Sequence, residues 1–242
     1  RKIFRLKLRP VAELRAPEVG TLYFPDPALM NSLVTAWGGT GSAINGFVYF
    51  GSTNVWTLER LMLTNSMLGI PPGYLWNITN DLTVSTGGVV VAPYGVLTIG
   101  GDLALTNSAM FRIYGGETNG STGRYGALVD VGGEFAIASN CWVYPYGQST
   151  NGGCVRFKAS SLTLVTGGGI NADGRGYARE RGRGKGTTSA GIASGAGYGG
   201  RGGDSLSGYG ARGGVTYGST NAPLNSGSGG GYDSSGHRGG AG

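Results

Sequence analysis

Three carboxylates stand at equivalent places in the sequence, where they could act together on one ligand. Each comes immediately before an apolar-x-apolar triplet, and the three residues are Asp81, Asp102 and Glu134. If the triplets stack at the spacing of neighbouring strands, about 4.8 Å, the carboxylates form a line. Like charges that close repel one another unless water or a cation lies between them. The line therefore has three interpretations: a Ca²⁺ site, an acid pair for glycan chemistry, or a solvated row beside Arg60.

The solvated row is the interpretation that we favour. Repulsion between adjacent carboxylates at a surface corner is about 1 to 3 kcal/mol, which water and salt can offset. Calcium takes about six to eight oxygen ligands, and this column supplies only some of them. We therefore expect Arg60 to pair with Asp81, and we expect no cofactor or metal to be required, with Ca²⁺ as the alternative.

Other residues offer little support for catalysis. A Ser-His-Asp set would depend on the single histidine, His237, which lies in a glycine-rich stretch. One histidine and two cysteines also argue against a zinc site. Residues 167–176 superficially resemble a phosphate-binding loop, but they lack its Lys-Ser/Thr ending. We assign no catalytic residues from the sequence.

The two cysteines, Cys141 and Cys154, are 13 residues apart and flank a polar, glycine-containing loop. In an oxidising compartment this loop would allow them to form a disulfide. Cys141 adjoins Trp142 and could equally be a buried thiol. The sequence leaves both interpretations open.

A repeated segment positions these residues. Each copy contains an apolar-x-apolar triplet, which is the periodicity of a strand, followed by Asn, Thr, Ser or Gly, which are turn residues. The five copies begin at Leu61, Leu82, Leu103, Phe135 and Leu162. Their intervals are 21, 21, 32 and 27 residues, and self-similarity at a period of about 20 to 50 residues indicates a solenoid.

The repeat predicts two apolar columns that face inward and one polar column at a corner. The second apolar column lies two residues after the first and comprises Leu63, Val84, Leu105, Ile137 and Leu164. The polar column lies four residues after the first and comprises Asn65, Thr86, Asn107, Ser139 and Thr166. In such a ladder, side-chain amides and hydroxyls satisfy one another and the backbone of the bend. We expect this polar column to be structural.

These patterns predict an all-β fold, a parallel β-helix in which the longer intervals are rungs with insertions. A β-sandwich also offers short strands at regular spacing, but it does not explain why the same column recurs. Residues 1–56 would be an N-terminal cap or the first rungs, and residues 57–166 the solenoid. Residues 167–242 include 28 glycines among 76 residues and hold too few large apolar side chains for a conventional core. We expect this region to be loops laid on the solenoid or a flexible extension.

The net charge of +6 is unevenly distributed. Residues 1–15 carry +5, residues 16–166 carry −3 and residues 167–242 carry +4, so polyanion binding would belong to the two ends. Arg-Gly-Gly segments begin at Arg201, Arg212 and Arg238, and together with the alternating cations and glycines of residues 181–186 they resemble RNA-binding tails. Because such tripeptides arise readily by chance in a glycine-rich chain, nucleic-acid binding is a minor hypothesis.

No apolar run reaches the roughly 18 to 20 residues of a membrane-spanning helix. The chain begins without Met, and we take it to be a mature form or a fragment of a longer protein.

The repeated segments, together with residues 168–176 and 198–203, resemble the glycine-rich β-solenoid proteins of bacterial cell surfaces, relatives of autotransporter and adhesin passengers. The resemblance covers roughly residues 57–242. It implies a parallel β-helix, an extracellular or cell-surface location, and a role in adhesion or extracellular matrix. The implied partners are other copies of the chain, other surface proteins, and polysaccharide. It transfers no catalytic residues.

A second resemblance, to pectate-lyase-like enzymes, supplies the alternative function. These enzymes share the coil and typically use Asp-bound Ca²⁺ with a Lys or Arg base. This alternative predicts a groove beside the carboxylate row with Arg112 or Lys158 nearby. The structural interpretation instead predicts no turnover on glycans.

Overall fold

The computed structural model describes most of the chain between Gly20 and Asp233. The described residues are 20–27, 45–118, 125–206, 208–219, 221, 225–233 and 242. Across these ranges the regular structure consists of β-strands, and none of the described residues is α-helical. The cap that the sequence predicts at residues 1–56 is therefore described only at 20–27 and 45–56.

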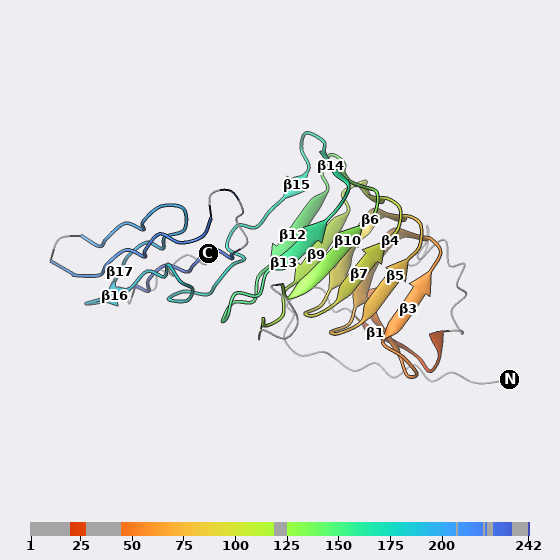
Figure 1. The fold of residues 1–242 in the computed structure, drawn as a ribbon, viewed down its shortest axis with the longest axis horizontal. Coiled ribbons are helices and arrows are strands. Elements are labelled where there is room, and N and C mark those ends of the chain that lie inside the picture. Colours follow the sequence, from red (N-terminus) through yellow and green to blue (C-terminus); the bar gives the residue numbers. More distant parts are fainter. Residues whose placement is uncertain are drawn as a thin grey trace. The chain divides into compact units, whose positions relative to one another are not determined.

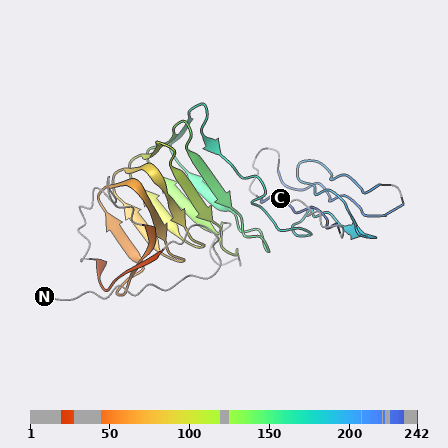
Figure 2. The ribbon, with the colours of Figure 1, turned by 180° about the vertical axis from the view of Figure 1, so that it is seen from behind.

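From Val55 onward each rung of the solenoid passes through three faces, and the strands of successive rungs stack side by side (Figures 1 and 2). The first face contains the first halves of β4 (Leu61–Ile70) and β6 (Leu82–Val91), then β8 (Leu103–Thr106), β11 (Glu134–Ile137) and β14 (Ser161–Leu164). The second face contains β1 (Gly20–Phe24), β2 (Asn45–Phe50), the second halves of β4 and β6, then β9 (Met110–Tyr114), β12 (Trp142–Tyr146) and β15 (Gly169–Ile170). The third face contains β3 (Val55–Leu58), β5 (Leu75–Ile78), β7 (Val96–Ile99), β10 (Ala127–Val131) and β13 (Val155–Lys158).

The register of the first face matches the repeat residue for residue. Its strands pair in parallel through the column Leu61, Leu82, Leu103, Phe135 and Leu162. The first four of these side chains are buried, as are the corresponding members of the second apolar column. Parallel pairing from rung to rung excludes the β-sandwich and confirms the predicted parallel β-solenoid. In the last rung, however, Leu162 and Leu164 are each 51% exposed.

Large aromatic side chains fill the interior next to the aliphatic columns. Trp56 and Trp76 face one another edge to face, with ring centroids 4.6 Å apart. Phe111 and Phe135 meet in the same way at 6.4 Å, and all four side chains are fully buried. This interior is a conventional apolar core, built by alternate residues of short strands.

The chain forms two compact units. The solenoid unit comprises residues 1–113, 127–144 and 156–170, and the glycine-rich unit comprises residues 114–126, 145–155 and 171–242. The two longer intervals of the repeat, 32 and 27 residues, each contain an insertion after a strand of the second face. The first insertion is residues 114–126 and the second is residues 145–155, and both belong to the glycine-rich unit.

Within the glycine-rich unit, backbone packs against backbone. The Gly202 N–H donates to the Gly214 carbonyl at 2.9 Å, and the Gly214 N–H donates to the Gly195 carbonyl at 2.9 Å. A Cβ added to Gly213 would collide with the carbonyl oxygen of Gly202. Regular pairing in the described part of this unit is limited to the antiparallel strands β16 (Thr188–Ser189) and β17 (Ile192–Ala193). Close approach of bare backbones therefore takes the place of an apolar core here.

Hydrogen bonds tie the second insertion to the glycine-rich segment inside this unit. The Ala178 N–H donates to the Ser149 carbonyl at 2.8 Å, and the Tyr177 hydroxyl donates to the Asn151 carbonyl at 2.9 Å. Arg175 lies over the ring of Tyr146, 4.8 Å from its centroid. These contacts give the unit a defined internal structure.

Candidate functional site

The three carboxylates predicted to form a line, Asp81, Asp102 and Glu134, are called the acidic column. This column lies at the corner between the third and first faces, and its carboxylates accept hydrogen bonds from the next rung. Arg60 and Asp81 form an ion pair of 3.2 Å, as the sequence predicts. Asp81 Oδ1 accepts the backbone N–H of Asp102 at 3.0 Å, and Asp102 Oδ1 accepts that of Glu134 at 2.7 Å. Glu134 Oε1 accepts the hydroxyl of Thr163. Each acid therefore holds a residue of the next rung in the stack.

Glycines beside this corner leave room for the carboxylates. A Cβ on Gly101 would collide with Asp81 Oδ1, and a Cβ on Gly133 would collide with Asp102 Oδ1. The pairs of glycines that precede Asp102 and Glu134 are thus a requirement of close stacking. Among the described residues, no group of three or more His, Cys, Asp or Glu side chains is placed to hold a metal ion.

The polar column lies at the corner between the first and second faces. Asn65, Thr86 and Asn107 have φ angles of 50°, 57° and 52°, the left-handed conformation that turns the chain there. The Asn107 amide donates to Ser85 Oγ at 2.9 Å, and the Ser139 hydroxyl donates to the Thr166 carbonyl at 2.8 Å. Positive φ suits Asn, whereas a β-branched residue such as Thr86 is strained in it.

The cysteines lie in different units and are not joined by a disulfide in this structure. Cys141 is buried in the solenoid unit, and Cys154 is half-buried in the glycine-rich unit. Burial raises the pKa of the Cys154 thiol above its usual value, because the charged thiolate loses hydration.

The two cations considered as the base of a lyase, Arg112 and Lys158, each contact other residues. Lys158 on the third face pairs with Asp130 at 2.8 Å. Arg112 on the second face lies against the sulfur atoms of Met67 and Met110, at 4.0 and 3.4 Å. His237 and Arg238 lie outside the described residues.

The glycine-rich unit contains a hollow that the sequence does not predict. Its volume is about 640 Å³, and it is lined by residues 178–181 and 185–188. Three cations, Arg179, Arg181 and Lys185, line it together with one acid, Glu180, and all four are exposed. The alternation of cations and glycines from Arg181 to Gly186 was the signal that could have indicated it.

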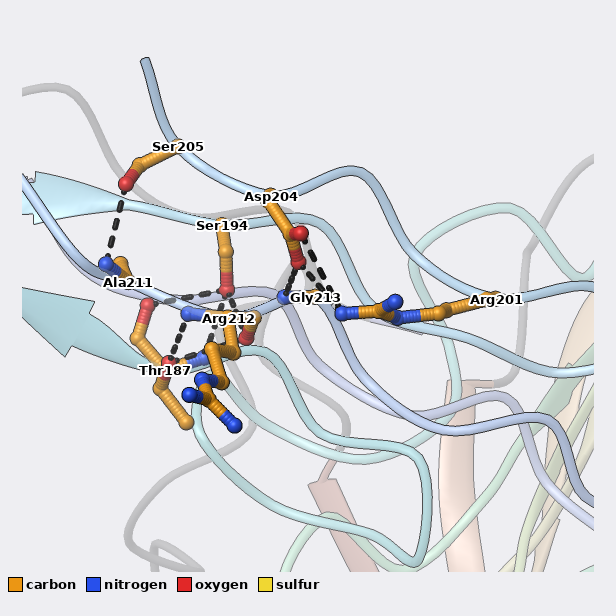
Figure 3. A network of polar contacts seen from close by, with 8 residues as sticks. All are labelled: Thr187, Ser194, Arg201, Asp204, Ser205, Ala211, Arg212 and Gly213. Atoms are coloured by element: carbon orange, nitrogen blue, oxygen red, sulfur yellow. Dashed lines mark hydrogen bonds and ion pairs between the residues drawn. The ribbon is translucent and has the colours of Figure 1, made fainter. Parts of the chain in front are cut away.

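A polar network fixes one wall of the hollow (Figure 3). The Thr187 hydroxyl accepts the Arg212 N–H and donates to the Arg212 carbonyl, both at 2.9 Å. The Ser194 hydroxyl accepts the Thr187 N–H at 2.8 Å and also lies 2.6 Å from the Arg212 carbonyl. Three segments of the glycine-rich chain are thereby held together around Thr187.

Asp204 belongs to the same network (Figure 3). Its Oδ1 accepts the backbone N–H of Gly213 at 2.6 Å and the guanidinium of Arg201 at 2.9 Å. Ser205 Oγ accepts the Ala211 N–H at 3.0 Å. Arg201 is therefore paired with a carboxylate, and it is not among the residues that line the hollow.

Two of the charged side chains in the hollow are also held in place. Glu180 Oε1 accepts the hydroxyl of Thr188, which in turn accepts the Tyr232 N–H at 2.7 Å. Arg179 lies over the ring of Tyr232, 4.5 Å from its centroid. Arg181 and Lys185 form no ion pair with a carboxylate of any described residue.

Within the described residues, none of the structure is a helix of the length and apolarity needed to cross a membrane. Comparison of the chain with protein-family models, with curated proteins and with solved structures finds no match.

Proposed function

We propose that this chain is an extracellular structural or adhesive protein that acts by assembly and binding. The observation that carries the proposal is the end of the solenoid at β14. Leu162 and Leu164 continue two columns that are buried in every earlier rung, yet both are 51% exposed, and the adjacent Val165 is 47% exposed. Exposed apolar side chains in such a contiguous group are typical of an interaction surface.

The backbone of β14 supports the same conclusion. One edge of the strand pairs with β11, and among the described residues no strand pairs with its other edge. An uncovered edge offers a row of N–H and C=O groups to another chain. The occupant that we propose is β14 of a second copy, because Ser161–Leu164 carries no charge and two such strands meet without repulsion. Burying each leucine there would contribute about 1 kcal/mol.

Two further points support a scaffold. The acidic column is engaged in holding successive rungs together, and the two cations considered for a lyase have other contacts. The likeness of the sequence to glycine-rich surface solenoids supports the extracellular location that we propose.

The test is the oligomeric state of the purified chain, measured by light scattering after size exclusion. At chain concentrations up to about 100 µM we expect a dimer or a larger assembly. A contact with a binding free energy of about 5 kcal/mol is partly populated in this range. Leu164→Lys should shift it to a monomer, because it places a charge at the centre of the contact. Met62→Lys is the matched control, since Met62 is also exposed, at 44%, but lies on the outer side of the first face.

A wild-type chain that remains monomeric over this range would contradict self-association through β14. Equal loss of assembly in both variants would contradict the location of the contact.

A further inference from the structure

We infer that the hollow lined by residues 178–181 and 185–188 binds an anionic polysaccharide, a linear polymer that carries carboxylates or sulfates. The inference deepens the proposed function, on which it rests for the extracellular setting, by naming the class of partner. It concerns a different surface from β14, so the two can fail separately.

The charge of the hollow is the first argument. Three cations and one acid give its lining a net charge of +2, and the solvent reaches all four side chains. The Glu180 carboxylate is bonded to Thr188, whereas Arg181 and Lys185 have no carboxylate partner among the described residues. A concave surface with an excess of one sign of charge raises the local concentration of the opposite charge.

The backbone arrangement of the cations is the second argument. Between Arg181 and Gly186, the cationic residues Arg181, Arg183 and Lys185 are exposed, while Gly184 and Gly186 are buried. The buried glycines pack against other backbone segments, and a Cβ on Gly186 would collide with the Ser194 carbonyl. The glycines therefore anchor the segment and leave its cations exposed, and two of these cations, Arg181 and Lys185, line the hollow.

The rigidity of the walls is the third argument. The Gly229 N–H donates to the Arg181 carbonyl at 3.0 Å, and the Gly186 N–H donates to the Gly229 carbonyl at 3.1 Å. The Glu180 N–H donates to the Gly230 carbonyl at 2.9 Å. Because these bonds hold the backbone of the hollow before a ligand arrives, binding loses less conformational freedom.

The lack of an aromatic platform favours a glycan over a nucleic acid. Single-stranded nucleic acids bind by stacking bases on aromatic side chains in addition to charge. Among the described residues that line the hollow, none is aromatic, and the ring of Tyr232 beside it already has Arg179 over one face. Recognition here depends on charge, which suits a polymer that repeats its anionic groups.

The experiment measures binding of the purified full chain to polygalacturonate and to dextran sulfate, with neutral dextran and a single-stranded oligonucleotide as comparisons. Titration calorimetry at several salt concentrations gives the affinity. We expect binding to at least one anionic glycan, weakening as salt rises, and no binding to dextran. Binding to both glycans indicates recognition of charge density, and binding to one identifies the anionic group.

The variant Arg181→Gln with Lys185→Gln tests the location. We expect its dissociation constant for the glycan to rise about tenfold, because two charges that face the ligand are lost. The matched control is Arg60→Gln with Lys158→Gln, which removes the same residue types and the same net charge from exposed positions of the solenoid unit. Circular dichroism of both variants checks that the fold is kept.

Four results would overturn the inference: no binding to either anionic glycan, equal weakening in both double variants, equal binding to neutral dextran, or tighter binding to the oligonucleotide than to either glycan. The titration is repeated with Leu164→Lys. Unchanged glycan affinity in that variant shows that the hollow acts independently of self-association, so a failure of one proposal is distinguishable from a failure of the other.

Discussion

At the scale of single residues, the carboxylates of the acidic column act as acceptors for the following rung. Asp81 and Asp102 each bond to the backbone N–H of the next acid in the column. The sequence predicts the column and the Arg60–Asp81 pair, because the repeat places these residues at one position of each rung. It does not predict the backbone bonds, since those depend on how each side chain turns at the corner.

Asp102→Ala should lower stability by about 1 kcal/mol, because the Glu134 N–H loses its acceptor. Asp102→Asn should lower it less, since the amide oxygen still accepts a hydrogen bond. Thermal unfolding followed by circular dichroism measures both. We also expect the same melting temperature in millimolar Ca²⁺ and in EDTA.

A rise of several degrees in Ca²⁺, abolished by Asp102→Asn, would show that the acidic column is a metal site. In that case the interpretation of its carboxylates as acceptors for the next rung would be wrong.

At the scale of the element, each strand of the first face has one side in the core and one outside. In β8, Leu103 and Leu105 are buried, while Ala104 and Thr106 are half-buried on the outer side. The period of two in the sequence predicts this alternation directly. The same logic applies to every rung except the last, where Leu162 and Leu164 have the right pattern but are left uncovered by any described strand.

Leu105→Asp should unfold the solenoid unit, because an unpaired charge in the apolar interior costs several kcal/mol. Ala104→Asp is the matched control, since the adjacent side chain points outward and its carboxylate keeps contact with water. Far-ultraviolet circular dichroism and a denaturant titration report on both variants. Similar stability of the two would contradict the assignment of Leu105 to the interior.

At the scale of the whole molecule, the two units are stabilised in different ways. The solenoid unit has an apolar core of stacked aliphatic and aromatic side chains. The glycine-rich unit has backbone hydrogen bonds between glycines, supported by contacts such as those of Tyr198 with Tyr217 and of Ser228 with Tyr217. Its stability therefore depends on the absence of side chains at particular positions.

Gly213→Ala should loosen the glycine-rich unit by about 1 to 3 kcal/mol, because the new Cβ meets the Gly202 backbone. Gly203→Ala is the matched control, since a Cβ there has open space around it and should be neutral or slightly stabilising. Limited trypsin digestion measures the effect through cleavage at Arg201 and Arg212.

Faster cleavage in Gly213→Ala alone is the expected result. Equally rapid digestion of the wild-type chain and both variants would show that backbone packing does not hold this unit together.

The solenoid, with its parallel register, its rung length and its inward columns, can be predicted from the amino-acid sequence. Apolar side chains recur at the same position of each repeat, so that Leu82 stands where Leu61 stands one rung earlier. This recurrence is visible in the sequence without any contact between the two residues. Three further features depend on contacts in space that the sequence pattern does not contain. Leu162 and Leu164 are exposed, because burial at the end of a coil depends on which residues lie next to the last rung. The described residues of 171–233 form a compact unit that the sequence does not predict, because contacts between glycine backbones leave no pattern of apolar side chains. Arg179, Arg181 and Lys185 line one hollow, because the turn at Gly182, with φ of 93°, sets where neighbouring charges point.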